Sequence, residues 1–329
     1  QFADAISRAL RAAERVNRHA ADDDHVTQFE LLTAAAYSEL ARQGVDAAVI
    51  EAGLGGHYDA TNVIPSKVTV LTNVGLEHTR WLGPTVEAIA REKLDVLQPG
   101  TTLILGPGMH PDAVAVGQQI AAERNAALVF AGDDPHTHVA AMGGFQRRNF
   151  AVAQTAAQQF MTALGAGALD PVAVSAAGAD VQVPGRLQAV DEKPLTLLDG
   201  AHNPDGIKAV AESLDELSNS TKGTRVAVVS ILDDKDASGM LAALAPHFDK
   251  FVFTSSHNPR ALPPPTLESL MHQCSDTPTQ SVRDPHAALQ RGRELAGGSG
   301  LVLATGSIYL VAHLLRSPGA TTRRHASRM

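Results

Sequence analysis

Hydrophobic and polar positions follow two periods along this chain, and together they predict an α/β protein. Short apolar runs, typical of buried parallel strands, are followed by longer stretches with apolar residues at helical spacing. The predicted strands are a run from Val45 to Glu51 and the segments 68–71, 103–105, 127–130, 195–198, 226–229, 251–253 and 301–303. The predicted helices are residues 2–16, 27–42, 84–97, 112–124, 149–164, 205–217, 237–245, 265–272, 286–296 and 307–315. This alternation is typical of βαβ units with parallel sheets.

A stretch rich in alanine and glycine, residues 165–178, interrupts the alternation and predicts a domain boundary. The length of 329 residues also favours two domains, at about 150 residues each. We therefore expect a first domain at residues 1–166, a linker at 167–183, a second domain at 184–316 and a tail at 317–329.

Composition and charge exclude several classes of protein. The formal net charge is −8, whereas a general nucleic-acid surface is basic, so we expect no nucleic-acid partner. No apolar run reaches the roughly 20 residues that span a bilayer, and we expect no membrane contact. The single cysteine, Cys274, excludes an internal disulfide and fits a reducing, cytoplasmic setting.

The most informative stretch follows the first apolar run. Glu51 ends that run, and three glycines occur in Gly53-Leu54-Gly55-Gly56. Ligands of open α/β sheets bind at the carboxyl ends of the strands, and glycine lets a ligand approach the backbone. The stretch is therefore either a site for a metal or polar substrate, or a tight turn with Glu51 solvated.

Two further residues of the first half carry possible chemistry. His78 follows the strand 68–71, so a parallel sheet could bring it to the edge where Glu51 lies, and the two could share a divalent cation. The alternative is that His78 caps a turn and never meets Glu51. Lys93 lies on the side of a predicted helix that carries Ile89, where a lysine ordinarily snorkels to water or pairs with an acid.

The second half has its own candidate turn, Asp199-Gly200-Ala201-His202-Asn203-Pro204. The strand 195–198 ends in Asp199, and Asn203-Pro204 starts a helix. An acid and a histidine beside a helix amino terminus suit ribose hydroxyls and phosphate, although a simple capping turn stays open. Pro184-Gly185-Arg186 presents a guanidinium that could bind phosphate or could be an ordinary surface arginine.

Eight segments together resemble one family of enzymes. In order they are Glu51-Ala-Gly-Leu-Gly-Gly-His-Tyr-Asp59-Ala-Thr-Asn62, Gly75-Leu-Glu-His78, Ile89-Ala-Arg-Glu-Lys93, Gln146-Arg-Arg-Asn149, Pro184-Gly-Arg186, Asp199-Gly-Ala-His-Asn-Pro204, Asp234-Lys-Asp236 and Thr305-Gly-Ser307. This order is similar to that of folylpolyglutamate synthases and bifunctional dihydrofolate synthases, which are Mur-type ligases. The resemblance implies an incomplete central ATPase domain followed by a Rossmann-like carboxyl-terminal α/β domain.

The resemblance also implies a reaction. ATP phosphorylates a carboxylate of dihydropteroate or a folate, and the amine of L-glutamate attacks the acyl phosphate to form an amide. Charge builds on the phosphoryl oxygens during this transfer, so cations are needed there. The implied cofactors are ATP and Mg²⁺, with a monovalent cation as a further candidate, and we expect the protein to be a monomer that binds small molecules.

The resemblance assigns roles to particular residues. Glu51 and His78 would hold magnesium, and Lys93 matches the lysine that the family carries as a carbamate, an anion able to hold a second metal. Lys93 and His202 are the expected catalytic residues. Those expected to contact ATP are Asn149, Arg186 and Asp199, and those expected to line the pterin site are Thr27, Gln28, Phe29, Glu30, Tyr58, Asp59 and Ala60.

Three departures from the family pattern affect these expectations. The phosphate-binding loop of the type Gly-Thr-Asn-Gly-Lys-Gly-Ser is expected upstream of Gln1, so we expect a fragment or trimmed chain, with negligible ligase activity if it is complete. His57 stands where the family usually has arginine. The segment between Phe130 and Gln146 is short for the family.

Two other functions compete with this hypothesis. Another Mur-type ligase would join an amino acid to a cell-wall nucleotide or related acid, and the match at residues 27–30 disfavours it. A non-catalytic remnant would bind folate or a partner through its second domain without turning substrate over.

Overall fold

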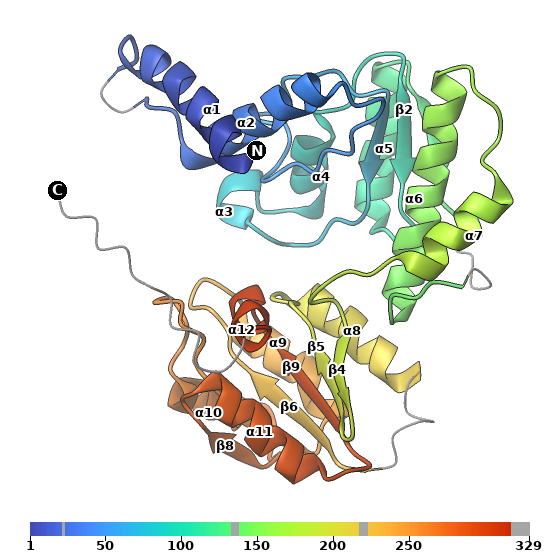
Figure 1. Ribbon diagram of the computed structural model, residues 1–329. Helices are drawn as coiled ribbons and strands as arrows, with labels where there is room; N and C mark the ends of the chain where they lie inside the picture. Colours follow the sequence, from blue (N-terminus) through green and yellow to red (C-terminus); the bar gives the residue numbers. More distant parts are fainter. Residues whose placement is uncertain (22–23, 133–137, 217–222, 317–329) are drawn as a thin grey trace. The chain divides into compact units, whose positions relative to one another are not determined.

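The computed structural model describes residues 1–21, 24–132, 138–216 and 223–316 (Figure 1). The predicted tail at 317–329 and parts of the segments 22–24 and 130–146 lie outside the described residues. The chain divides into two compact units, one formed by residues 1–131 and 155–168 and the other by 132–154 and 169–329. The domain boundaries at 166 and 184 stay a prediction. Helix α6 (Gly144–Ala163) contributes to both compact units, because residues up to 154 belong to the second unit and those from 155 to the first.

The first unit contains a small parallel sheet with the order β1-β2-β3. Its strands are β1 (Val68–Leu71), β2 (Thr102–Leu105) and β3 (Ala127–Phe130), as the apolar runs predicted. The core includes Ile89 and Leu94 of α4 (Val86–Leu94) and Val116 and Ile120 of α5 (Pro111–Glu123), packed with Leu103 of β2. A short helix, α3 (Thr79–Leu82), precedes α4.

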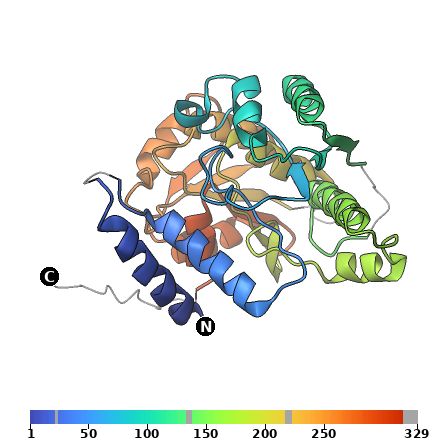
Figure 2. The same cartoon turned by 90° about the horizontal axis from the view of Figure 1, so that it is seen from above.

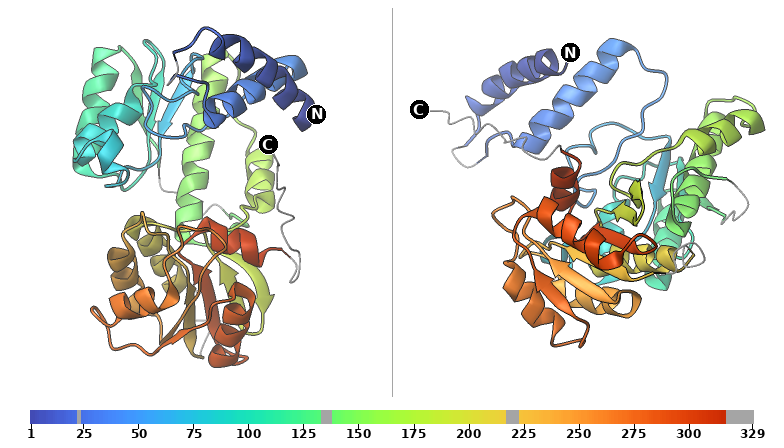
Figure 3. Two further views of the ribbon diagram at one scale, coloured as in Figure 1. Left: turned by 90° about the vertical axis from the view of Figure 1, so that its left-hand side faces the viewer. Right: turned by 60° about the horizontal axis from the view of Figure 1, so that its bottom comes forward.

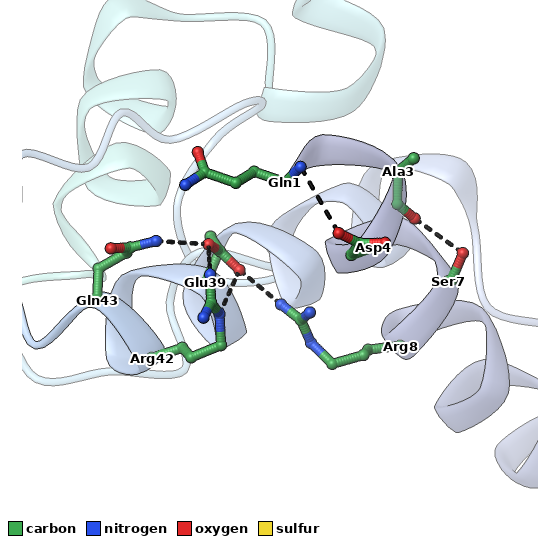
Figure 4. A network of polar contacts seen from close by, with 8 residues as sticks. All are labelled: Gln1, Ala3, Asp4, Ser7, Arg8, Glu39, Arg42 and Gln43. Carbon is green, nitrogen blue, oxygen red and sulfur yellow. Dashed lines mark hydrogen bonds and ion pairs between the residues drawn. The ribbon is translucent and has the colours of Figure 1, made fainter.

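Helices α1 (Phe2–Asn17) and α2 (Gln28–Gln43) lie side by side (Figures 1 and 2). Small side chains, Ala5 and Ala9 of α1 and Ala35 of α2, are buried between them. An ion-pair network closes the contact, because Glu39 accepts from Arg8 of the other helix at 2.6 Å and from Arg42 at 2.7 Å (Figure 4). These contacts hold the two helices as a pair.

The second unit contains a six-stranded sheet with the order β4-β5-β9-β6-β7-β8. Its strands are β4 (Gln188–Glu192), β5 (Leu195–Leu198), β6 (Arg225–Val229), β7 (Lys250–Phe253), β8 (Thr279–Ser281) and β9 (Leu301–Thr305). Only β4 runs antiparallel to its neighbour; the other pairs are parallel. Helices cover both faces of this sheet (Figure 3).

The two faces explain why these strands read as continuous apolar runs. In β6, Ala227 and Val229 face the core that contains α8 (Pro204–Glu216), α9 (Ala237–Leu244) and α10 (Pro264–Met271). The alternate residues Val226 and Val228 face α11 (Pro285–Ala296) and α12 (Ile308–Leu314). All four residues from Val226 to Val229 are therefore buried, whichever face of the sheet they occupy. A 3₁₀ turn, η1 (Ala245–His247), follows α9.

One predicted strand is absent, and a helix lies within the predicted linker. The run from Val45 to Glu51 is not a strand, and Val49 in it is 101% exposed. Within the described part of the chain this run pairs with no strand, and β1 is left as an edge strand that pairs only with β2. The predicted linker at 167–183 contains a helix, α7 (Pro171–Asp180), which Asp170 caps by accepting from Val172 N at 2.9 Å. No helix among the described residues is both long and apolar enough to cross a membrane.

Candidate functional site

The site in the second unit is centred on Asp199, which follows β5 at the carboxyl edge of the sheet. The residue is only 1% exposed. Its Oδ1 accepts from Ala201 N at 2.7 Å and its Oδ2 from Leu187 N at 2.8 Å. Leu187 has a left-handed backbone with φ of 42°, an uncommon conformation for a non-glycine residue. The carboxylate thus fixes two separate turns from one buried position.

Burial raises the pKa of the Asp199 carboxyl above its ordinary value. The hydrogen bonds from Ala201 and Leu187 and the charges of Arg186 and His202 act in the opposite direction. A buried carboxylate that is only partly compensated by its surroundings is suited to bind a polar ligand or a cation.

Arg186 and His202 lie beside this carboxylate on neighbouring turns. Gly200 N donates to Gly185 O at 2.8 Å, which joins the Arg186 turn to the Asp199 turn. A Cβ on Gly200 would lie 2.6 Å from Arg186 Nη1, so the guanidinium occupies the space that glycine leaves. His202 Nδ1 lies 2.9 Å from Gly200 O. The structure therefore brings the predicted residues Arg186, Asp199 and His202 together.

Asn149, the remaining residue predicted to contact ATP, lies in α6, where its Nδ2 is 3.4 Å from Gln146 Oε1. The helix begins at Gly144, five residues before the predicted start. Gln146 Nε2 and, at the end of β9, Thr305 Oγ1 are buried and have no hydrogen-bond partner among the described residues. Buried polar atoms are ordinarily paired, so each is a candidate to bind a ligand or an ordered water.

A cavity of about 450 Å³ lies at the carboxyl ends of β7 and β8, and the sequence interpretation missed it. Its lining residues are Ser255, Ser256, His257, Asn258, Arg283 and Asp284. Ser256 Oγ is buried without a partner within the described ranges. The rule that identified Asp199, a polar cluster directly after a buried strand, could have found this cluster too.

In the first unit, the glycine stretch that begins at Gly53 is organised by Asp59. The Oδ2 of Asp59 accepts from Gly53 N at 2.9 Å and Leu54 N at 2.8 Å. The Oδ1 accepts from Thr61 N at 2.9 Å and Thr61 Oγ1 at 2.6 Å. Burial acts to raise the pKa of Asp59, but these hydrogen bonds outweigh it and lower the pKa. The predicted substrate residue Asp59 is thus also the structural centre of its loop.

Phe29 joins the same stretch from helix α2. A Cβ on Gly53 would lie 2.4 Å from Phe29 Cζ, so the ring packs directly on the glycine backbone. The neighbouring Thr27 and Glu30 form a capping box, in which Glu30 N donates to Thr27 Oγ1 at 3.3 Å and Thr27 N donates to Glu30 Oε2 at 2.7 Å. Those hydrogen bonds from Thr27 lower the pKa of Glu30. Of the predicted pterin residues, Phe29 and Asp59 therefore converge on Gly53.

Tyr58 and Ala60 complete that predicted set, together with Gln28, the first residue of α2. Tyr58 is 89% exposed and its ring packs edge-on against His57, with centroids 4.3 Å apart. An exposed aromatic ring beside a polar loop can stack on a flat ligand. Its role in substrate binding stays a prediction.

The predicted metal ligands lie in the same unit. Glu51 lies in the irregular, exposed stretch 45–52, and His78 precedes α3 with a left-handed φ of 54°. His78 Nε2 lies 3.7 Å from Glu77 Oε1, an acid that the sequence interpretation quoted but did not assign. No group of three His, Cys, Asp or Glu side chains that could hold a metal gathers within the described ranges. A shared cation on Glu51 and His78 stays a prediction.

Lys93 lies in the last turn of α4, as predicted, and is half-buried. The glycine stretch lies directly on this turn, because a Cβ on Gly56 would be 2.7 Å from Glu92 O and 2.7 Å from Lys93 O. The structure therefore places the backbone of the predicted catalytic lysine against the glycine stretch that follows Glu51.

Comparison with known proteins shows what this chain is similar to. Residues 185–308 match the family described as Mur ligase, glutamate ligase domain. The chain is 33% identical over 270 residues to the dihydrofolate synthase/folylpolyglutamate synthase of Mycobacterium tuberculosis, covering 72% of this chain and 54% of that protein. It is 32% identical to the folylpolyglutamate synthase of Lacticaseibacillus casei (81% and 67% covered) and 30% identical to the bifunctional enzyme of Escherichia coli (89% and 70%). The chain thus spans about half the length of the first of these relatives.

Solved structures show the same likeness. Folylpolyglutamate synthase of Mycobacterium tuberculosis with ADP and AMPPCP superposes with a TM-score of 0.85 at 26% identity, covering 95% of this chain and 77% of that one. Escherichia coli FolC with DHPP and ADP gives 0.77 at 28% identity, covering 89% and 71%. The bifunctional enzyme of Yersinia pestis with AMPPNP and a Mn ion gives 0.74 at 28% identity, covering 89% and 71%. The chain belongs to the family of folylpolyglutamate synthases and dihydrofolate synthases, within the Mur-type ligases.

Proposed function

We propose that this chain forms part of an ATP-dependent ligase that adds L-glutamate to dihydropteroate, a folate or both. The observation that carries the proposal is the convergence of Arg186, Asp199 and His202 at one edge of the sheet in the segment that matches the glutamate ligase domain. The solved relatives that bind ADP and DHPP supply the ligand class.

The proposed chemistry proceeds in two steps. A substrate carboxylate oxygen attacks the γ-phosphorus of ATP, and the bond to the β–γ bridging oxygen breaks, which releases ADP and leaves an acyl phosphate. The amine of L-glutamate then attacks the acyl carbon, phosphate leaves with the bonding electron pair, and the amine loses a proton. The first step is needed because phosphate is a better leaving group than the oxide or hydroxide that a free carboxylate would have to expel.

Residues of the second unit would bind the nucleotide. The guanidinium of Arg186 offers a planar pair of donors that matches phosphate oxygens. Asp199 would accept hydrogen bonds from ribose hydroxyls or coordinate an ATP-bound cation, and Asn149 can donate or accept through its amide. Thr305 Oγ1, which has no hydrogen-bond partner in the described part of the chain and lies one strand from Asp199, supports a polar ligand at this edge. His202 would hold or transfer a proton.

The first unit would supply the cation and the acid substrate. Glu51 and His78 offer a carboxylate oxygen and an imidazole nitrogen, a donor set that fits a divalent ion completed by water and phosphate oxygens. When bound, Mg²⁺ would neutralise charge on the transferred phosphoryl group. A carbamate on Lys93 would add a further ligand for a metal, and a monovalent cation would be a further ion at the site. Thr27–Glu30 and Tyr58–Ala60 would line the pterin site.

The test is glutamate-dependent release of phosphate. It compares this chain with the same chain extended at Gln1 by a segment carrying a phosphate-binding loop, each given ATP, magnesium and either dihydropteroate or tetrahydrofolate. We expect turnover by the extended chain with at least one acceptor, and its loss in Glu51→Ala with the fold intact by circular dichroism. Absence of turnover with both acceptors would refute the proposal. Turnover with a nucleotide-linked acid instead would assign another Mur-type specificity.

A further inference from the structure

The glycine stretch Gly53–His57 is held at its far end by an ion-pair cluster that the reaction scheme does not use. His57 Nδ1 contacts Asp95 Oδ2, and Asp95 is the residue that directly follows α4, two positions after Lys93. The other oxygen of the same carboxylate pairs with Arg124 Nη2, from the residue that follows α5. One carboxylate thus joins the glycine stretch to the ends of two helices.

Arg124 fixes this carboxylate in place. Its Nη1 donates to Asp95 O at 3.0 Å and also to Leu97 O, so the guanidinium binds both the main chain and the side chain of the α4 terminus. The side chains of Asp95 and Arg124 are 31% and 28% exposed, whereas His57 is 48% exposed. Asp95 is therefore anchored by Arg124, and His57 is the more exposed partner that it holds.

The rest of the stretch has little room for displacement. A Cβ on Gly55 would lie 2.9 Å from Glu92 Oε1 and 2.9 Å from Leu82 Cδ2, and Gly56 lies against the carbonyls of Glu92 and Lys93. At its start, Gly53 and Leu54 are bound by Asp59. The stretch is therefore fixed by Asp59 internally and by Asp95 on α4.

We propose that Asp95 is a positioning residue that, anchored by Arg124, holds His57 and so keeps the glycine stretch seated on the Lys93 turn of α4. Its effect on turnover rests on the proposed function, because Glu51 lies two residues before this stretch and the carbonyl of Lys93 lies against Gly56. His57 stands at a position where the family pattern has arginine, and both side chains can donate to the Asp95 carboxylate.

The first experiment needs no activity. Amide hydrogen exchange is measured by mass spectrometry on this chain for wild type, His57→Ala, Asp95→Asn and His57→Arg. We expect exchange at the amides of residues 53–56 to rise about two- to fivefold in His57→Ala and Asp95→Asn, the range of a partly exposed ion pair. His57→Arg should keep the amides of residues 53–56 as protected as in wild type, in contrast to His57→Ala. Peptides covering β2 should not change.

A matched control distinguishes a specific effect on the glycine stretch from the effect of losing any histidine–aspartate pair at the surface. His110 lies 3.7 Å from Asp112 in the same unit and is similarly exposed, but it caps α5. His110→Ala should leave the exchange of residues 53–56 unchanged. The proposal is overturned if exchange at 53–56 is unaffected in His57→Ala, if it rises equally in β2, or if His57→Arg fails to restore it.

The second experiment measures turnover in the extended chain. His57→Ala should lower kcat about two- to fivefold while the KM for ATP stays constant, and the double variant with Asp95→Asn should be no worse than either single variant. Additive losses would overturn the coupling. If the wild-type extended chain shows no turnover, the proposed function fails while the exchange experiment still decides the positioning role.

Discussion

Gly200→Ala should separate nucleotide binding from stability. The added Cβ would lie 2.6 Å from Arg186 Nη1 and 2.8 Å from Ile308 Cδ1. Both atoms are ends of side chains that can rotate away, so the overpacking cost falls at the low end of about 1–3 kcal/mol. Loss of glycine flexibility in the unfolded chain returns about 0.4–1 kcal/mol. The free energy of unfolding should therefore fall by about 1 kcal/mol or less, or about 2–4 °C in Tm.

The same substitution should weaken nucleotide binding much more. The guanidinium of Arg186 must leave the position beside the Asp199 turn, and a hydrogen bond to a charged group contributes about 1.5–3 kcal/mol, or roughly 10- to 150-fold in affinity. The assay is calorimetric titration of the extended chain with a non-hydrolysable ATP analogue and magnesium, paired with thermal unfolding of each variant.

Gly300→Ala is the matched control. Its Cβ would lie 2.3 Å from Ala296 O and 2.4 Å from Thr224 O, which are backbone atoms that cannot rotate away. It precedes β9, at the opposite end of that strand from Thr305. We expect it to destabilise the protein by about 1–3 kcal/mol or more while the affinity for the analogue stays constant in the folded fraction. Unchanged affinity in Gly200→Ala, or greater destabilisation there than in Gly300→Ala, would refute the assignment of Arg186.

Three further outcomes follow from single side chains. The pKa of His313 is lowered from 6.5, first by burial and then by His257 and His286. Its contribution to stability is therefore complete above pH 6.5 and declines as the pH falls through the lowered pKa of the folded state. In urea unfolding, His313→Asn should lose less free energy of unfolding between about pH 7 and about pH 5 than wild type does, and equal losses would contradict this. Asp59→Asn should cost about 1–3 kcal/mol at neutral pH, since an amide nitrogen cannot accept the loop N–H groups, and the difference from wild type should shrink in acid as the lowered pKa of Asp59 is crossed. Thr305→Val should leave thermal stability unchanged or raise it, because Oγ1 has no partner among the described residues. If that hydroxyl binds nucleotide, the same variant should bind the ATP analogue less tightly in calorimetry.

Burial on two faces made the second sheet readable from the sequence. The runs at β6, β7 and β9 are apolar apart from one polar residue at an end of each strand, and the run at β5 is interrupted only by the buried Thr196. Each of the four strands was predicted to within a residue or two. Strands β4 (Gln188–Glu192) and β8 (Thr279–Ser281) were missed because they lie at the edges of the sheet and carry polar residues. The placement of β9 between β5 and β6 depends on long-range pairing, which local periodicity does not encode.

In two segments, local amino-acid composition led to the wrong secondary structure. The run from Val45 to Glu51 has the composition of a buried strand, but strand formation depends on pairing and burial as well as on composition, and among the described residues this run is exposed and pairs with no strand. Helix α7 was read as linker from its alanine and glycine content, although Asp170 and Pro171 are a standard start signal for a helix. In the first case the sequence lacked the pairing information, and in the second the signal was present but outweighed by composition.

One glycine in each candidate site follows the same physical rule, which explains what the sequence could and could not locate. At Gly53 the space of a Cβ is taken by the ring of Phe29, and at Gly200 by the guanidinium of Arg186. Each glycine therefore marks a point where a side chain from another segment enters the backbone surface, rather than a point of free backbone rotation. Sequence spacing reveals the glycine, but the entering residue is fixed only by tertiary packing. Substituting these glycines should consequently displace a predicted ligand-binding side chain before it unfolds the chain.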